Sequence, residues 1–151
     1  MPKSTNRPRL PDDLVTTLAA AKDRWKSFED WVSVKLNMKK TKASGGYLSN
    51  GDARNDDRML ECKWSDNTGP VILRRSVWEK ARNQAFRQLR KPVLAMANPN
   101  EGYVVFWIKR DVSTGSKATL TLSDNLESKI GSDIVKVISL DKLSKLSIDG
   151  D

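Results

Sequence analysis

Hydrophobic residues near the start of the chain recur every three or four positions. Such spacing places them on one stripe of an α-helix, and the stripe consists of Leu14, Leu18, Ala21, Trp25, Phe28, Val32 and Leu36. Pro11 suits the first helical position, and Asp12 and Asp13 suit the first turn, where acidic groups are stabilised by the helix dipole. We therefore expect a helix from about residue 11 to about residue 38, which a cap formed by Ser27 and Asp30 could divide in two.

Residues 59–64 show a different pattern, in which alternate positions share their character. Successive side chains of a β-strand point to opposite faces, so one face would carry Leu60, Cys62 and Trp64. The opposite face would carry Met59, Glu61 and Lys63. We expect the first face to be buried and the second to present an acid beside a base.

The remaining pattern alternates between apolar strands and one strongly polar helix. Tyr47 and Leu48 predict a short strand before a turn at residues 50–51, and residues 71–73 form a further apolar segment. A helix is predicted at residues 76–91, starting at a Ser76–Glu79 capping box and ending before Pro92. Later strands are predicted at 93–97, 103–108, 117–122 (at a sheet edge) and 134–140, followed by a short helix at 141–146.

This order of elements favours an α/β or α+β fold in which helices flank a central mixed sheet. A chain of 151 residues corresponds to one domain with a substantial core. We place that domain at residues 11–151. The preceding residues 1–10 are basic and carry proline and serine, and we expect them to form a flexible arm.

The charge of the chain is basic and unevenly distributed. Residues 1–100 hold 20 basic and 11 acidic groups, whereas residues 101–151 hold 7 and 8. A basic region of this kind often binds a polyanion such as nucleic acid, although basic surfaces also keep proteins in solution.

Several function classes are excluded by composition. The chain has no histidine, which excludes catalysis by a histidine base and zinc sites built on histidine. Its single cysteine permits no intrachain disulfide, and the sequence shows neither a membrane-spanning apolar run nor the apolar core of a signal peptide. We therefore expect a cytoplasmic or otherwise intracellular protein without membrane association.

The stretch GDARNDDRMLECKW contains the candidate chemistry. Carboxylates of Asp52 and Glu61, together with a main-chain carbonyl such as that of Cys62, offer the oxygen ligands that Mg²⁺ prefers. Lys63, beside Glu61, could position or activate water and stabilise charge developing on a phosphate. The arrangement therefore suits the hydrolysis of a phosphodiester.

Each of these features also has an ordinary structural explanation. Most Glu-x-Lys pairs are exposed strand residues, and aspartate after glycine is common in turns. Asp56 and Asp57 are alternative partners for Glu61, because both lie close to it in sequence. What favours a site is the apolar opposite face of the strand and the basic helix that follows.

At these positions the sequence resembles the PD-(D/E)XK nuclease superfamily. The motif consists of Gly51-Asp52 and, after a spacer, Glu61-Cys62-Lys63. Within the superfamily the chain is most similar to Holliday junction resolvases of the archaeal and phage type. Those enzymes carry a glutamate on an N-terminal helix, a basic segment that runs into Ser-Gly, an aspartate at the second strand and Glu-x-Lys on the third.

The resemblance covers about residues 27–97, within an expected nuclease core at about 27–110. It implies a catalytic set of Asp52, Glu61, Lys63, Glu29 and, in the next helix, Gln84. It further implies metal ligation by Asp52, Glu61 and the Cys62 carbonyl. The implied cofactor is Mg²⁺, for which Mn²⁺ can substitute, and the implied fold is restriction-endonuclease-like.

A second group of residues is predicted to contact DNA. Lysine and arginine side chains bind phosphates by releasing counterions. The candidates are Lys40, Lys42, Ser44, Arg74, Arg75, Lys80, Arg82 and Arg87. The five tryptophans could stack on bases, but packing in the core or in a dimer interface is the simpler expectation.

Our hypothesis from sequence is a metal-dependent, structure-selective DNA endonuclease that acts on branched DNA, most simply a four-way junction. The resemblance implies a homodimer and a role in recombination or repair. The small size and the basic arm are compatible with a phage or mobile-element protein. Two alternatives stay open. One is another PD-(D/E)XK nuclease, of restriction, repair or DNA-end-processing type. The other is a non-catalytic basic DNA-binding protein.

Overall fold

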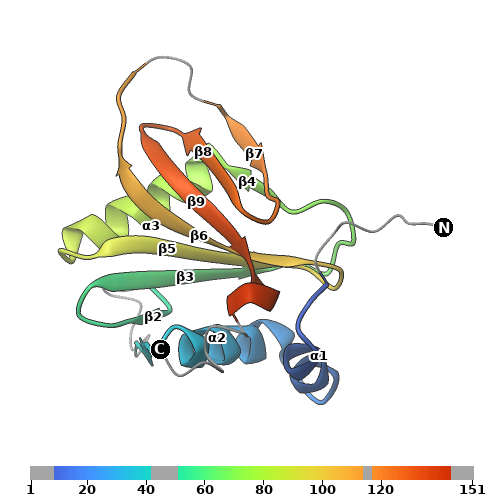
Figure 1. Cartoon of the computed structure of the whole chain (residues 1–151). Coiled ribbons are helices and arrows are strands. Elements are labelled where there is room, and N and C mark those ends of the chain that lie inside the picture. The colour runs from blue at the N-terminus through green and yellow to red at the C-terminus, as the bar shows by residue number, and fades with distance from the viewer. Residues whose placement is uncertain (1–8, 42–50, 114–116, 144–151) are drawn as a thin grey trace.

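A seven-stranded mixed sheet forms the centre of the protein in this computed structural model, which describes residues 9–41, 51–113 and 117–143 (Figure 1). The strands lie in the order β1-β2-β3-β5-β6-β9-β8, and β4 and β7 form a separate two-stranded sheet. The helices are α1 (Asp12–Ala19), α2 (Arg24–Lys35) and α3 (Arg75–Arg87). The strands are β1 (Lys39–Lys40), β2 (Ala53–Arg54), β3 (Arg58–Trp64), β4 (Ile72–Arg74), β5 (Lys91–Ala97), β6 (Gly102–Arg110), β7 (Thr119–Thr121), β8 (Leu126–Ile130) and β9 (Asp133–Ser139).

This architecture confirms the predicted mixed α/β class with a central mixed sheet. Helices α1 and α2 cover one face of the sheet, and α3 covers the other (Figure 1). In the described part of the chain, no helix is long and apolar enough to cross a membrane. The predicted arm at residues 1–10 and the predicted strand at 47–48 fall mostly or wholly outside the described residues.

The N-terminal helical region divides earlier than the sequence pattern indicated. Helix α1 ends at Ala19 and α2 begins at Arg24, so the predicted cap at Ser27 is wrong. The break turns Trp25 away from the core, and this side chain is 50% exposed. Helix α2 buries Phe28 and Val32 of the predicted stripe, and it also buries Trp31, which the stripe did not include. The Trp31 Nε1 donates to Asp13 Oδ2 at 3.0 Å and so links α1 to α2.

Strands β3 and β5 pair in parallel over seven residues, and α3 lies in the connection between them. Helix α3 was expected at 76–91 but ends at Arg87, and Leu89 takes a left-handed φ of 59° before β5 begins at Lys91. The predicted Ser76–Glu79 capping box is also wrong. No side chain caps the helix, and Glu79 Oε2 instead accepts from Arg75 Nε at 2.9 Å.

The last third of the chain extends the sheet. The strand predicted at 134–140 is β9, but it is an inner strand between β6 and β8, and β8 itself was not predicted. The strand expected at 117–122 is β7, which pairs with β4 outside the main sheet. Residues 140–143 are helical, in line with the predicted start of the terminal helix; the remainder lies outside the described residues.

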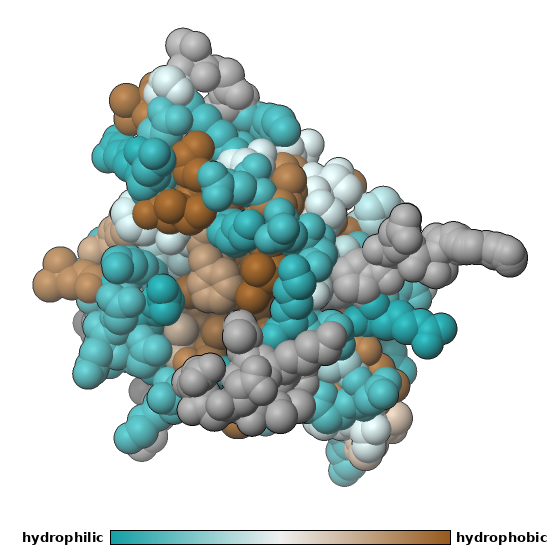
Figure 2. Space-filling model, viewed as in Figure 1, coloured by the Kyte–Doolittle hydropathy of each residue, from teal (hydrophilic) through white to brown (hydrophobic). Residues whose placement is uncertain are grey.

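Two hydrophobic clusters lie on opposite faces of the sheet. The first packs Leu60, Cys62 and Trp64 of β3 against α1 and α2, as the alternating pattern predicted. The second lies beneath α3 and the β4–β7 pair, and its largest member is the fully buried Trp78. Figure 2 shows apolar side chains near the middle of one face, over β6 and β9, with polar side chains around them.

The buried carboxylate of Asp133 connects α3, β6 and β9. Only 1% of this residue is exposed. Its Oδ2 accepts from Trp78 Nε1 at 2.8 Å and from Arg82 Nη1 at 3.0 Å, and its Oδ1 accepts from Trp107 Nε1 at 3.0 Å. Three donors thus offset the cost of burying the charge.

Replacing Asp133 by asparagine should destabilise the fold by about 3 kcal/mol, because it leaves Arg82 without its buried partner and sets an amide group against existing donors. Urea unfolding followed by tryptophan fluorescence measures the change. Glu127→Gln removes an exposed carboxylate from the neighbouring β8 and should cost at most about 0.5 kcal/mol. Equal stability of the two variants would contradict the structural role of Asp133.

Candidate functional site

Asp52 occupies the point where β2 stops pairing with β3. Its main-chain N–H donates to Leu60 O at 2.8 Å. Its side-chain Oδ2 then accepts from the next available N–H of β3, that of Cys62, at 2.6 Å. The carboxylate therefore replaces the backbone acceptor that a longer β2 would have supplied, and Asp52 is fixed against the edge of β3.

Gly51 makes this position possible. Its φ is +74°, a conformation that glycine adopts readily and other residues rarely adopt. A Cβ at this position would lie 2.7 Å from Met59 Cγ and 2.9 Å from the Leu60 carbonyl oxygen. The Gly-Asp pair recognised in the sequence thus has a steric reason, since glycine lets the chain approach β3 closely.

The main-chain carbonyl of Cys62 lies at the same edge. In an antiparallel ladder the N–H and C=O of one residue point to the same neighbour, and the Cys62 N–H points to Asp52. The Cys62 side chain packs with the first hydrophobic cluster. Burial raises the pKa of its thiol well above the ordinary value, which agrees with the prediction of a core residue and not a nucleophile.

Glu61 and Lys63 lie on the opposite face of β3, beneath α3. The Lys63 Nζ is 3.6 Å from Glu61 Oε2. Both side chains line a cavity of about 310 Å³ that also includes Lys80 and the buried Gln84 of α3. Burial, and then the charge of Asp52, raises the pKa of Glu61, while Lys63 opposes the rise.

Glu29 approaches Asp52 from α2. Its side chain is 8% exposed, and its Oε1 is 3.3 Å from Lys40 Nζ. Burial raises the pKa of Glu29 to about 7, and the charges of Asp52 and Glu61 add to this effect. Burial likewise raises the pKa of Asp52. The three predicted acids therefore interact electrostatically, and together they form a region of concentrated negative charge.

The donor chemistry of this region fits a hard divalent cation. The two carboxylates and the carbonyl beside β3 are oxygen ligands, and Mg²⁺ typically uses one or two carboxylates and completes its shell with water and phosphate oxygens. Among the described residues, no three Asp, Glu, Cys or His side chains are arranged to hold a metal. An ion here would therefore rest on Asp52, Glu61 and the Cys62 main-chain oxygen, without a third side chain.

Asp56 and Asp57, the alternative partners for Glu61, lie elsewhere. Asp57 is exposed in the β2–β3 turn, within 3.9 Å of Arg58 Nε and 3.7 Å of Lys91 Nζ. Asp56 is exposed in the same turn. The geometry therefore favours Asp52.

The predicted DNA-binding residues separate into three groups. Arg82 is engaged by the buried Asp133, and only 18% of its side chain is exposed, so its place in the predicted phosphate-binding set is not supported by its position. Arg75 is held by Glu79, and Lys40 by Glu29 and Asp30. The exposed or cavity-lining candidates are Arg74, Lys80 and Arg87, while Lys42 and Ser44 lie outside the described residues.

Sequence reasoning missed a second basic region at the β1 edge. Lys39, Arg54 and Arg90 line one groove there. Arg54 could have been identified from the sequence, because this basic residue follows the candidate acid Asp52 by only two positions. Arg90 was assigned to the predicted helix, and only the early end of α3 brings it to the β2–β3 turn.

Glu29→Gln should flatten the dependence of stability on pH. An acid whose pKa rises on folding binds protons more tightly in the folded state, so the wild type loses unfolding free energy as the pH rises from about 4.5 to about 7. The variant should lack about 1–3 kcal/mol of this decline. Urea unfolding at several pH values, in the presence of chelator, measures it. Glu127→Gln should retain the wild-type slope, and a wild-type slope in Glu29→Gln would refute the raised pKa.

Comparison of the chain with models of protein families, with curated proteins and with solved structures finds no match.

Proposed function

We propose that the protein is a metal-dependent, structure-selective DNA endonuclease. The observation that carries the proposal is the convergence of Glu29, Asp52 and Glu61 at the end of β2, where burial raises the pKa of all three and the charge of Asp52 adds to the rise at Glu29 and Glu61. Such a concentration of partly buried carboxylates opposes folding unless a cation or a proton offsets it. The adjacent Lys63 and the basic residues of α3 then suit a phosphate better than a neutral substrate.

The residues have distinct roles in the proposed reaction. Asp52, Glu61 and the Cys62 carbonyl would hold Mg²⁺ or Mn²⁺, which supplies charge stabilisation at the phosphate. Lys63 orients the attacking water and stabilises the developing negative charge. The water oxygen bonds to phosphorus, one ester P–O bond breaks, and the leaving oxygen takes a proton. Gln84 and Lys80 face the same cavity, where they can hydrogen-bond to phosphate oxygens.

The preference for branched DNA, and for the four-way junction in particular, follows from the sequence resemblance to resolvases. The same resemblance places the reaction on DNA inside a cell, in recombination or repair. A restriction-like or end-processing nuclease would use the same acids and lysine on a different substrate. A panel of DNA structures therefore separates these activities without changing the proposed chemistry.

Wild-type protein should cleave a labelled four-way junction in Mg²⁺ faster than linear duplex, flap or single strand, and chelator should abolish cleavage. Glu61→Gln should lower the rate by about 100-fold or more, because it removes a metal ligand. Asp52→Asn should act similarly. Denaturing gels of end-labelled DNA give the rates.

Glu127→Gln is the matched control, since it removes an exposed carboxylate far along the sheet order, and it should cleave as the wild type does. Cleavage of another structure would keep the chemistry and remove the resolvase assignment. Salt-sensitive binding with no cleavage in Mg²⁺ or Mn²⁺, and equal or tighter binding by Asp52→Asn, would identify a non-catalytic DNA-binding protein instead.

We further propose a homodimer, on the basis of the resemblance, because two linked sites can cut a symmetric junction in pairs. Light scattering coupled to gel filtration should give about twice the 17.0 kDa chain mass. A monomeric mass that persists in the presence of junction DNA would contradict the dimer and leave the single-site chemistry untouched.

A further inference from the structure

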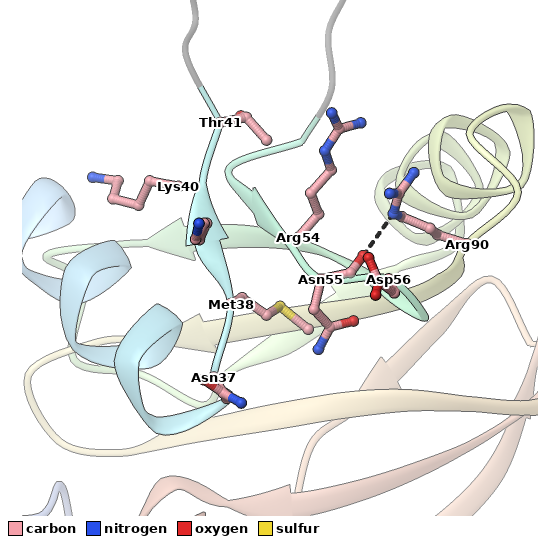
Figure 3. A pocket seen from close by; sticks show the side chains of 9 residues that line it. Asn37, Met38, Lys40, Thr41, Arg54, Asn55, Asp56 and Arg90 are labelled. Atoms are coloured by element: carbon pink, nitrogen blue, oxygen red, sulfur yellow. Dashed lines mark hydrogen bonds between the residues drawn. The ribbon is translucent and has the colours of Figure 1, made fainter.

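A groove of about 700 Å³ lies at the β1 edge of the sheet, separate from the cavity that contains Glu61 and Lys63. Its walls come from β1, from the β2–β3 turn and from the segment after α3 (Figure 3). Lining residues include four cationic side chains, Lys39, Lys40, Arg54 and Arg90, and one acidic side chain, Asp56. The groove therefore carries an excess of positive charge.

Much of this charge is not neutralised by acidic partners. Arg90 donates from Nε to the Asn55 carbonyl at 2.7 Å and from Nη1 to the Gln88 carbonyl at 3.0 Å. These neutral acceptors fix the guanidinium in place but leave its charge uncompensated. In the described part of the chain, neither Lys39 nor Arg54 has an acid within ion-pair distance. Lys40 differs, since Glu29 and Asp30 hold it.

Strand register places the free cations on the same face as the candidate site. Lys39 pairs with Arg54, and Arg54 pairs with Met59. Directly paired residues point to the same face of a sheet, and Met59 shares its face with Glu61 by the two-residue period. Figure 3 accordingly shows Arg54 and Arg90 on the α3 side of β1, with Lys40 directed toward α2.

The separation along the strand matches the dimensions of a nucleic acid. Arg54 follows Asp52 by two residues, which is about 7 Å of extended chain. Successive phosphates of one DNA strand lie about 3.4 Å apart along the helix axis and farther apart through space, so this separation corresponds to one or two nucleotides. A strand whose phosphate lies at Asp52 would thus present a nearby phosphate to Arg54 and Lys39.

We propose that this groove binds the sugar–phosphate backbone of the DNA one or two nucleotides from the phosphate that is cleaved. The inference rests on the proposed nuclease function and adds the course of the substrate strand past the site. Contact is with the backbone and not with bases, since none of the described residues that line the groove has an aromatic side chain for stacking. Binding in the groove is therefore independent of sequence.

The test compares two double variants that each remove two positive charges. Lys39→Ala with Arg54→Ala removes the free cations of the groove, and Lys22→Ala with Lys26→Ala removes two exposed lysines of the N-terminal helical region. Arg90 is left intact because its main-chain contacts support the fold. Both proteins also carry Glu61→Gln and are measured in chelator, so that no cleavage competes with binding.

Fluorescence anisotropy with a labelled four-way junction gives the affinity at several salt concentrations. Losing two phosphate contacts should lower the slope of log affinity against log salt by about 1.8. The parent protein is the Glu61→Gln protein, and the groove variant carries Lys39→Ala and Arg54→Ala in addition. The ratio of the parent's affinity to the groove variant's affinity should therefore fall about tenfold between 50 and 200 mM salt, as the slope implies. The control should keep the parent slope.

The position of the contact is tested with neutral phosphates. A methylphosphonate placed one or two nucleotides from the cut, on the side that Arg54 faces, should weaken binding by the parent but should not further weaken binding by the groove variant. An unchanged salt slope in the groove variant, or equal loss in the control, would overturn the groove assignment while cleavage by the wild type still supported the nuclease. Failure of the wild type to bind or cut any DNA would overturn both.

Discussion

Parallel strands cannot be joined by a tight turn, so the pairing of β3 with β5 requires a long connection that crosses one face of the sheet. Helix α3 fills that connection and covers the face that carries Glu61 and Lys63. Without it, these two side chains would be an ordinary exposed pair on a strand. The crossover therefore creates both the cavity and the desolvation that distinguishes Glu61 from a surface glutamate.

The opposite edge of β3 depends on a shorter feature, the early end of β2. Asp52 leaves the ladder and its carboxylate takes over one hydrogen bond, so the acid is held by the strand that it flanks. Glu29 then reaches the same place from α2. The candidate site is thus assembled from both layers of the fold, with β3 as their common wall.

The sequence pattern predicted the parts of the fold that rest on local periodicity. Strand β3, its two faces and the buried strand β5 were predicted because their alternation or apolar character is strong. The break between α1 and α2 was misplaced because Ala21 and Trp25 continue the apolar stripe, although the chain turns there and exposes Trp25. Strand β8 escaped notice because its sequence, LESKI, is mostly polar and partly exposed. No local signal could show that β9 would lie inside the sheet, since this depends on long-range pairing.

The candidate site shows the same difference between residues that a local pattern identifies and residues whose role depends on long-range contacts. Asp52, Glu61 and Lys63 could be named because their motif is compact, and Gln84 could be named from the family resemblance. The structure groups the four residues around β3. Arg82 could not be distinguished from its basic neighbours on α3. Only the tertiary structure shows that Arg82 donates a hydrogen bond to the buried carboxylate of Asp133, 51 residues away, and so has a structural role.

Cys62 has a practical consequence that follows from its position in the fold. It is the only thiol of the chain, and its side chain packs between β3 and the α1–α2 layer while its main chain contacts Asp52. The residue is only partly buried, but a thiol kept protonated is a weak nucleophile and reacts slowly with alkylating reagents, and it reacts faster when the surrounding structure opens. The rate of its modification therefore reports on local opening beside the acid cluster, and mass spectrometry can follow it.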